Sequence, residues 1–227
     1  MRVTVLGKSP AWQDVDGACS GYLVQGPGGV LLLDCGNGVF AKLRRHAHHA
    51  AVDAVVVSHL HADHFFDLVP FAYALTFALP GRAERPRLLV PRGGRATLRR
   101  IVGSWGTEDL LERAFALEEY APDDEGELLG LRLRLRAVPH FVPTSAVDVD
   151  DGAGRLTYGA DHGPSDALVD LARATDLLLI EATLPAPEEG GDPRGHLTPR
   201  EAGEHGARAG AARLVLTHRT DLLDARA

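Results

Sequence analysis

The amino-acid sequence has few cysteines and no long apolar run. Its two cysteines, Cys19 and Cys35, are too few for a disulfide framework, so we expect a reducing compartment and a cytoplasmic location. No stretch approaches the roughly 20 consecutive apolar residues that a membrane-spanning helix needs. The chain begins directly with a strand-like segment at 3–6, without the apolar region of a signal peptide. We therefore expect no membrane partner.

Lysine is also scarce, and the charge balance is negative. Lys8 and Lys42 are the only lysines among 227 residues, and the formal net charge is −7. This charge argues against a protein whose whole surface binds nucleic acid. Apolar residues make up 45% of the chain, which is enough for one well-cored domain and marginal for two. We expect residues 1–227 to form a single domain.

Hydrophobic patterning predicts alternating groups of strands and helices. Short apolar runs predict strands at 3–6, 21–24, 30–34, 53–58, 88–90, 131–136, 155–158, 177–181 and 213–217. Apolar residues at helical spacing predict helices at 37–49, 66–79, 165–174 and 198–209, and two more between 94 and 120. A strand-rich region followed by helices occurs twice. This order predicts an α/β fold in which two mixed sheets pack together with helices outside, an αβ/βα four-layer sandwich.

Two local patterns are especially informative about these elements. Residues 131–136 alternate strictly between leucine and arginine, which predicts a strand with one buried and one wet face, followed by a turn-rich hairpin. Thr198, Pro199 and Glu201 have the spacing of a helix start, with a capping residue, a proline in first position and the carboxylate of a capping box. The sequence therefore predicts a helix that begins directly after Thr198.

The densest group of chemically active side chains lies in the six residues from His59 to His64. Three histidines and an aspartate follow a buried apolar strand at this point, where a strand hands over to a helix. Imidazole and carboxylate groups are ligands that a divalent ion such as zinc prefers. His59 and His61 are two apart on an extended segment and can bind one ion. Asp63 and His64 lie past the bend and can serve a second ion.

Three more candidate ligands follow predicted strands elsewhere in the chain. His140, Asp161 and His218 each come directly after an apolar segment. Because side chains at strand ends can converge on one edge of a sheet, we expect these three to complete the metal site.

These motifs resemble those of the metallo-β-lactamase-fold hydrolases over nearly the whole chain. The segment 31–36 is similar to the family's early strand ending in aspartate, and His59–His64 is similar to its His-Xaa-His-Xaa-Asp-His signature. Segments 138–140, 158–161 and 214–218 are similar to its later motifs. Segments 181–183 and 196–198 resemble motifs of the phosphodiesterase branch that includes ribonuclease Z. His162 departs from this pattern, because that branch usually has threonine there.

The resemblance implies a role for each ligand. It implies that one zinc ion is held by His59, His61 and His140. It implies that a second is held by Asp63, His64 and His218, and that Asp161 bridges both. The nucleophile would be a hydroxide shared by the two ions, because zinc lowers the pKa of bound water to about 7. Asp63 would also orient that hydroxide, and manganese is the alternative ion.

The resemblance also implies catalytic roles outside the ligand set. His196 would donate a proton to the leaving oxygen, and Glu181 would hold its tautomer. The alternative for His196 is a role in starting the helix, and for Glu181 an ion pair with an arginine. We expect Asp34 to support a ligand loop through hydrogen bonds, Cys35 to lie in the core, and His205 to lie on the surface. We expect the end of the helix predicted at 37–49 to be solvent-exposed and to carry His46, His48 and His49.

The substrate is the least constrained part of the prediction. The segment from Arg82 to Arg100 contains seven arginines. They either bind phosphate or are ordinary solvent-exposed side chains. Only twenty residues separate His140 from Asp161, where ribonuclease Z carries a long arm that grips transfer RNA. This favours a small phosphodiester or cyclic nucleotide as substrate over ribonuclease Z-like 3′ RNA processing, and nucleic acid is the less favoured partner. The resemblance alone implies a homodimer.

Two other classes of protein compete with the phosphodiesterase prediction. A thioester or lactone hydrolase would use the same ions on an acyl carbon and would need an apolar cleft. Phe65, Phe66, Phe71, Tyr73 and Phe77 could supply that cleft, although they fit a core helix equally well. A diiron redox protein of this fold usually has glutamate at the position of His61, and a non-catalytic module would lack ligands. A metal-dependent hydrolase is therefore the favoured class.

Overall fold

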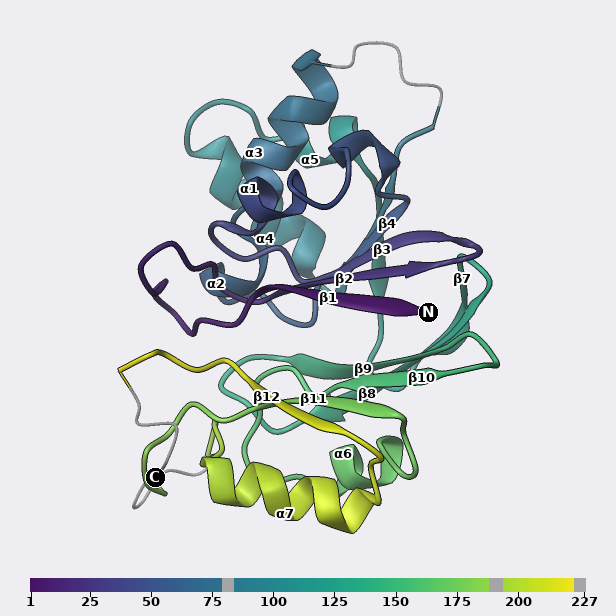
Figure 1. Ribbon diagram of the computed structural model, residues 1–227. Helices are drawn as coiled ribbons and strands as arrows, with labels where there is room; N and C mark the ends of the chain where they lie inside the picture. Colours follow the sequence, from purple (N-terminus) through teal and green to yellow (C-terminus); the bar gives the residue numbers. More distant parts are fainter. Residues whose placement is uncertain (79–83, 188–193, 223–227) are drawn as a thin grey trace.

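The computed structural model describes residues 1–78, 84–187 and 194–222 (Figure 1). Two six-stranded mixed sheets lie face to face, and the helices cover their outer sides. The predicted αβ/βα sandwich is confirmed.

The first sheet is built by the N-terminal half of the chain. Its spatial order is β1-β2-β3-β4-β5-β6. The strands β1, β2 and β3 are antiparallel neighbours, and β3 to β6 run parallel. The strands are β1 Arg2–Gly7, β2 Gly21–Gly26, β3 Gly29–Leu33, β4 Ala54–Val56, β5 Arg87–Pro91 and β6 Ala116–Tyr120.

The second sheet is built by the C-terminal half. Its order is β12-β11-β10-β9-β8-β7, in which β10, β11 and β12 run parallel and the other neighbours are antiparallel. The strands are β7 Glu125–Leu128, β8 Leu131–Val138, β9 Thr144–Asp150, β10 Arg155–Tyr158, β11 Leu177–Glu181 and β12 Leu214–Thr217.

The helices form two outer layers. Those beside the first sheet are α1 Val39–Leu43, α2 Ala62–Phe65, α3 Leu68–Tyr73, α4 Gly94–Gly103 and α5 Leu110–Ala114, with a 3₁₀ turn η1 at His49–Ala51 and a π-helical turn η2 at Ala74–Ala78. Those beside the second sheet are α6 Asp166–Leu171 and α7 Pro199–Ala209 (Figure 1). In the described residues, we find no helix that is both long enough and apolar enough to cross a membrane.

Alternation along the strands divides the apolar residues between the layers. In β3, Leu31 and Leu33 face the core between the two sheets, and Leu32 faces the helices. In β8, Leu131, Leu133 and Leu135 are buried, whereas the arginines between them are exposed or partly exposed. Each fully buried leucine contributes roughly 1.5–3 kcal/mol of hydrophobic free energy, so this pattern fixes the strand register.

The capping box that the sequence predicts at Thr198 is confirmed. Thr198 Oγ1 accepts a hydrogen bond from the Glu201 backbone N–H, and Glu201 Oε2 accepts one from the Thr198 backbone N–H. Arg194 donates two further bonds to the Glu201 carboxylate, at 2.8 and 2.7 Å. The start of α7 is therefore fixed beside the segment that carries His196.

Several predicted element boundaries were wrong. Residues 116–120 form a strand, not part of a helix, because they pair with β5. The turn-rich hairpin after β8 contains the strand β9, which pairs with β8 along its whole length. The helix expected at 37–49 is the much shorter α1. The helical region expected at 66–79 begins earlier, at Ala62, and is divided into α2, α3 and η2. Leu79 lies outside the described residues.

Candidate metal centre

The turn after β4 places its ligands on two sides of one bend. His59 is fully buried, and His61 has the extended backbone of the residue that precedes α2. Asp63 and His64 lie in the single turn of α2 and are both buried. The turn therefore delivers its four polar side chains to the edge where the two sheets meet.

Strand ends of the second sheet deliver the remaining candidate ligands. His140 follows β8, Asp161 follows β10 and His218 follows β12. His218 has a φ of 52°, in the left-handed region that few non-glycine residues occupy. The turn after β12 therefore takes a costly backbone conformation at the residue that reaches the centre.

The structure brings all seven predicted ligands together in two overlapping groups. The ligating atoms within each group lie within 4.8 Å of one another. One group is His59, His61, His140 and Asp161, and the other is Asp63, His64, Asp161 and His218. These are the two sets that the family resemblance implies, although the role of each residue stays a prediction.

The distances within the groups suit shared ions. His61 Nδ1 lies 3.2 Å from His59 Nε2 and 3.1 Å from His140 Nε2. Asp161 Oδ2 lies 3.2 Å from His218 Nε2 and 3.3 Å from His64 Nε2. Two nitrogen or oxygen ligands about 2.0–2.1 Å from one tetrahedral zinc are themselves about 3.3–3.4 Å apart. The spacing is therefore close to the spacing that a tetrahedral ion requires.

Two buried polar atoms of the centre provide a second test. Among the described residues, His64 Nε2 and Asp161 Oδ1 have no hydrogen-bond partner. A buried polar atom without a partner costs about 1–3 kcal/mol, and a bound ion removes that cost. The residues present therefore fit a pair of divalent ions.

The protonation of the first group also suits ion binding. Burial lowers the pKa of His59, and it lowers the pKa of His140 to about 4 with help from the neighbouring histidines. Burial also lowers the pKa of His61. These imidazoles are therefore neutral at pH 7 and offer lone pairs. The pKa of Asp63 is lowered as well, because hydrogen bonds from His218 and His64 outweigh the raising effect of burial.

Asp34 supports the centre through hydrogen bonds, as the sequence predicted. Its buried carboxylate accepts a bond from His64 Nδ1 at 2.8 Å, and further bonds from Tyr158 Oη at 2.7 Å and Ser58 Oγ at 2.8 Å. With Nδ1 bound to Asp34, Nε2 of His64 faces Asp161 Oδ2 at 3.3 Å, and the charges of Asp161 and Asp34 raise the pKa of His64 despite its burial. Asp34 thus fixes the ring orientation that an ion needs.

A second hydrogen-bonded chain joins His218 to His196. His218 Nδ1 lies 2.7 Å from Thr183 Oγ1, whose hydroxyl donates to Glu181 Oε2 at 2.8 Å. Glu181 Oε1 accepts from His196 Nδ1 at 2.9 Å. The His196 ring centroid lies 5.1 Å from that of His140 and 5.6 Å from that of His218. Glu181 thus holds His196 beside both ligand groups, and among the described residues no ion pair joins Glu181 to an arginine.

Sequence reasoning missed Thr183 and the carbonyl of Gly195. His140 Nδ1 donates to that carbonyl at 2.8 Å, which directs its Nε2 toward the ions. Thr183 lies two residues after Glu181, on the same edge, and that spacing was the available signal. The Gly195 carbonyl had no signal, because any residue type offers one. The glycine-rich loop at 190–193 that precedes it lies outside the described residues.

Two other expectations about histidines need correction. His205 is buried, not exposed: it accepts a bond from the Ser165 backbone N–H at 3.0 Å, and its Nδ1 donates to the Glu201 carbonyl at 2.7 Å. It therefore ties α7 to the start of α6. His49 is also buried, whereas His46 and His48 are exposed as expected. Cys35 is fully buried in the core, as predicted.

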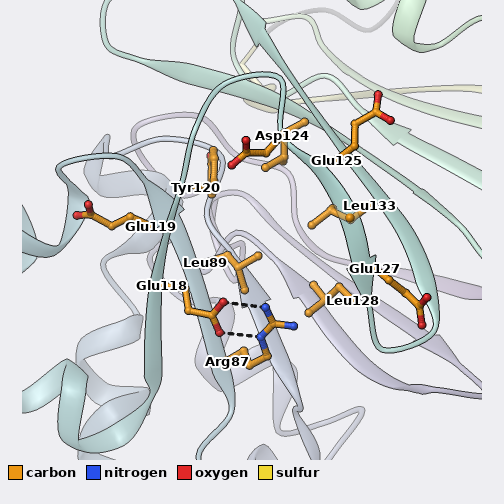
Figure 2. Close-up of a pocket in the computed structure, with 12 residues that line it drawn as sticks. Arg87, Leu89, Glu118, Glu119, Tyr120, Asp124, Glu125, Glu127, Leu128 and Leu133 are labelled. Atoms are coloured by element: carbon orange, nitrogen blue, oxygen red, sulfur yellow. Dashed lines mark hydrogen bonds and ion pairs between the residues drawn. The ribbon is translucent and has the colours of Figure 1, made fainter.

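Three of the six described arginines in the arginine-rich segment form ion pairs away from the centre. Arg87 makes a two-bond ion pair with Glu118, with both N–O distances at 2.8 Å, in the pocket that Figure 2 shows. Arg95 and Arg99 pair with Glu112. Arg82 lies outside the described residues. Most of this segment thus covers α4, α5 and β6.

The aromatic residues of α2, α3 and η2 do not form one cleft. Phe65 and Phe71 are buried in the core under the helices, whereas Phe66 and Phe77 are exposed. An acyl-binding cleft made of these side chains is therefore not supported.

Comparisons with known proteins agree with the fold. A family model described as a beta-lactamase superfamily domain matches residues 30–219. The uncharacterized protein Rv1339 of Mycobacterium tuberculosis is 36% identical over 223 residues, which cover 96% of this chain and 80% of the relative. The probable metallo-hydrolase YhfI of Bacillus subtilis is 31% identical over 219 residues, which cover 96% of this chain and 86% of the relative.

Solved structures give the same result. The crystal structure of YhfI matches with a TM-score of 0.83 at 26% identity, covering 96% of this chain and 85% of that one. The short form of human tRNase Z matches with a TM-score of 0.80 at 23% identity, covering 98% of this chain and 94% of that one, which shows a shared fold. This chain belongs to the metallo-β-lactamase superfamily. The family is one of metal-dependent hydrolases.

We predict that Asp34→Asn weakens metal binding by about 10- to 100-fold. The neutral amide is a weaker acceptor than the carboxylate for the hydrogen bond from His64 Nδ1. The measurement is competition for zinc against a coloured chelator. Asp170→Asn is the matched control, since Asp170 pairs with Arg173 on the surface. Equal zinc affinity in Asp34→Asn and wild type would contradict the role given to Asp34.

We predict that Thr183→Val lowers kcat by at least about tenfold with little change in KM, because valine breaks the chain between His218 and Glu181. Thr183→Ser keeps the hydroxyl and is expected to restore most of the rate. Thr97→Val on α4 controls for the change of side chain. A serine variant as slow as the valine variant would show that the methyl group, not the hydroxyl, matters.

Proposed function

We propose that this protein is a binuclear zinc phosphodiesterase that acts on a small phosphodiester or cyclic nucleotide. The observation that carries the proposal is the position of His196, held by Glu181 beside both ligand groups. An alkoxide leaving group needs a proton far more than a thiolate does, so a placed proton donor favours phosphodiester over thioester cleavage.

The residues of the centre would have separate roles in the reaction. Two divalent ions held there would supply a nucleophile from water at neutral pH and stabilise charge on the phosphate oxygens. Asp63, whose Oδ2 lies 3.1 Å from His218 Nε2, would orient that nucleophile while it holds an ion. His196 would give its proton to the leaving oxygen, and Glu181 would keep the Nδ1 proton in place so that the transfer uses Nε2. Zinc is the proposed ion because of the donor set, with manganese as the alternative.

The surroundings support a small substrate. The residues between His140 and Asp161 are occupied by β9, β10 and their short connections, and no long arm projects from this part of the described chain. Three of the six described arginines in the arginine-rich segment are paired with carboxylates, which reduces the charge that the segment offers to a polynucleotide. RNA 3′ processing is accordingly the less favoured activity. A homodimer and a cytoplasmic location remain proposals, which rest on the family resemblance and on the cysteine content.

An acyl hydrolase is the second candidate. A pocket of about 560 Å³ beside His140 is lined mainly by proline, valine and aromatic side chains, which would suit an acyl chain. The same ions would then act on a thioester or lactone carbonyl. Substrate comparison separates the two candidates.

The test compares two substrate classes on purified protein with its metal content measured. We expect two zinc ions per chain and turnover of bis-p-nitrophenyl phosphate that exceeds turnover of p-nitrophenyl acetate and an acyl thioester. Loss of activity on chelation and its return on adding zinc serve as the control. Acyl turnover alone, at full metal content, would overturn the proposal in favour of the second candidate.

We predict that His196→Ala retains both ions but is slow, with a loss of about 10²- to 10⁴-fold for an alkyl phosphodiester. The loss is expected to be much smaller for a nitrophenyl ester, whose leaving group needs no proton. His46→Ala, at an exposed histidine, is the control variant. Equal losses for both leaving groups would contradict a general-acid role.

A further inference from the structure

The pocket beside His140 extends from the end of β5 to residues 137–145, next to the metal centre. Its volume is about 560 Å³, within the range of roughly 300–1,000 Å³ typical of small-molecule sites. Its lining includes Arg92, Tyr120, His140 and Phe141. The pocket therefore borders the metal centre at His140, and its aromatic and cationic side chains are available to the part of a bound molecule that does not react.

Phe141 presents an aromatic ring to this space. Its ring centroid lies 5.0 Å from that of His140 and 5.9 Å from that of His196, yet the residue is 56% exposed. The ring is held in place by the Gly195 backbone: a Cβ at Gly195 would lie only 2.3 Å from the ring. An exposed, positioned aromatic face next to a catalytic centre is what a stacked base requires.

Arg92 supplies a charge that an apolar occupant would not use. Its side chain is exposed, and among the described residues no hydrogen bond or ion pair involves its guanidinium. This differs from Arg87, Arg95 and Arg99, which are all paired. An acyl chain offers Arg92 no acceptor, whereas the polar edge of a nucleobase offers several.

The other pocket in this region would reject a phosphodiester. It lies between β6 and β7, and Figure 2 shows Glu118, Glu119, Asp124, Glu125 and Glu127 around it. This negative charge repels an anion. The pocket beside His140 is therefore the one that fits an anionic ester with an aromatic substituent.

We propose that the pocket beside His140 is a nucleobase subsite, in which the base stacks on Phe141 and Arg92 binds its polar edge. The proposal rests on the proposed phosphodiesterase function and makes its substrate a nucleotide diester, such as a cyclic nucleotide. Phe141 and Arg92 are then specificity-determining residues. They bind the part of the substrate that does not react.

The test measures equilibrium binding, so it does not depend on turnover. The zinc-loaded protein is titrated by calorimetry with adenosine 5′-monophosphate and with ribose 5-phosphate, which lacks the base. Stacking of one base on an aromatic side chain is expected to make adenosine 5′-monophosphate bind about 5- to 150-fold tighter. In Phe141→Ala we expect this ratio to fall to the few-fold preference that Arg92 alone supplies, and in Phe141→Leu to fall to an intermediate value. In Arg92→Gln we expect the ratio to fall by a few fold.

Phe77→Ala is the matched control, because Phe77 is an exposed phenylalanine on η2 outside this pocket. It is expected to keep the wild-type ratio. Equal affinity for the two phosphates in wild type, or a ratio that survives in Phe141→Ala, would overturn the subsite. Phosphodiester turnover without base discrimination would overturn the subsite alone, whereas base discrimination without phosphodiester turnover would overturn the proposed function and support the subsite.

Discussion

The rest of the structure depends on placing five imidazoles, four of them buried, and two buried carboxylates at the edge shared by the two sheets. Removing such groups from water costs several kcal/mol for each charge unless opposite charge and hydrogen bonds compensate. The first sheet provides the turn from His59 to His64, and the second provides His140, Asp161 and His218 at strand ends. A pair of divalent cations balances the carboxylates and uses the lone pairs of the imidazoles. The sandwich architecture is thus what brings both ligand groups around Asp161.

Three of the five ligating rings are each held by a partner of a different kind. The carboxylate of Asp34 holds His64, the hydroxyl of Thr183 lies against His218, and the carbonyl of Gly195 holds His140. All three contacts are made at Nδ1, so Nε2 is the nitrogen directed at the ions. The contacts at Thr183 and Gly195 also connect the centre to the segment that carries His196 and to the ring of Phe141. Metal binding, proton donation and substrate binding therefore share one set of supports.

The ligands could be predicted from the sequence because their signals are local. Spacing in one turn and the ends of apolar strands are enough to find them, and the capping box at Thr198 is equally local. The strand β9 was missed because aspartates disfavour strands, but Asp148 is buried with bonds from Arg134, Arg155 and Thr157, which come from other strands. His205 was misplaced because alanine and glycine around it suggested a surface. Those small residues instead allow close packing, as an added Cβ at Gly206 would lie 2.9 Å from Leu214.

The most direct measurement is anomalous X-ray diffraction at the zinc edge from crystals of the zinc-loaded protein. The account predicts two peaks per chain, one among His59, His61 and His140 and the other among Asp63, His64 and His218. Asp161 is predicted to lie between the two peaks. A single peak, or zinc bound only at other side chains, would contradict the binuclear centre on which the proposed function and its substrate subsite both rest.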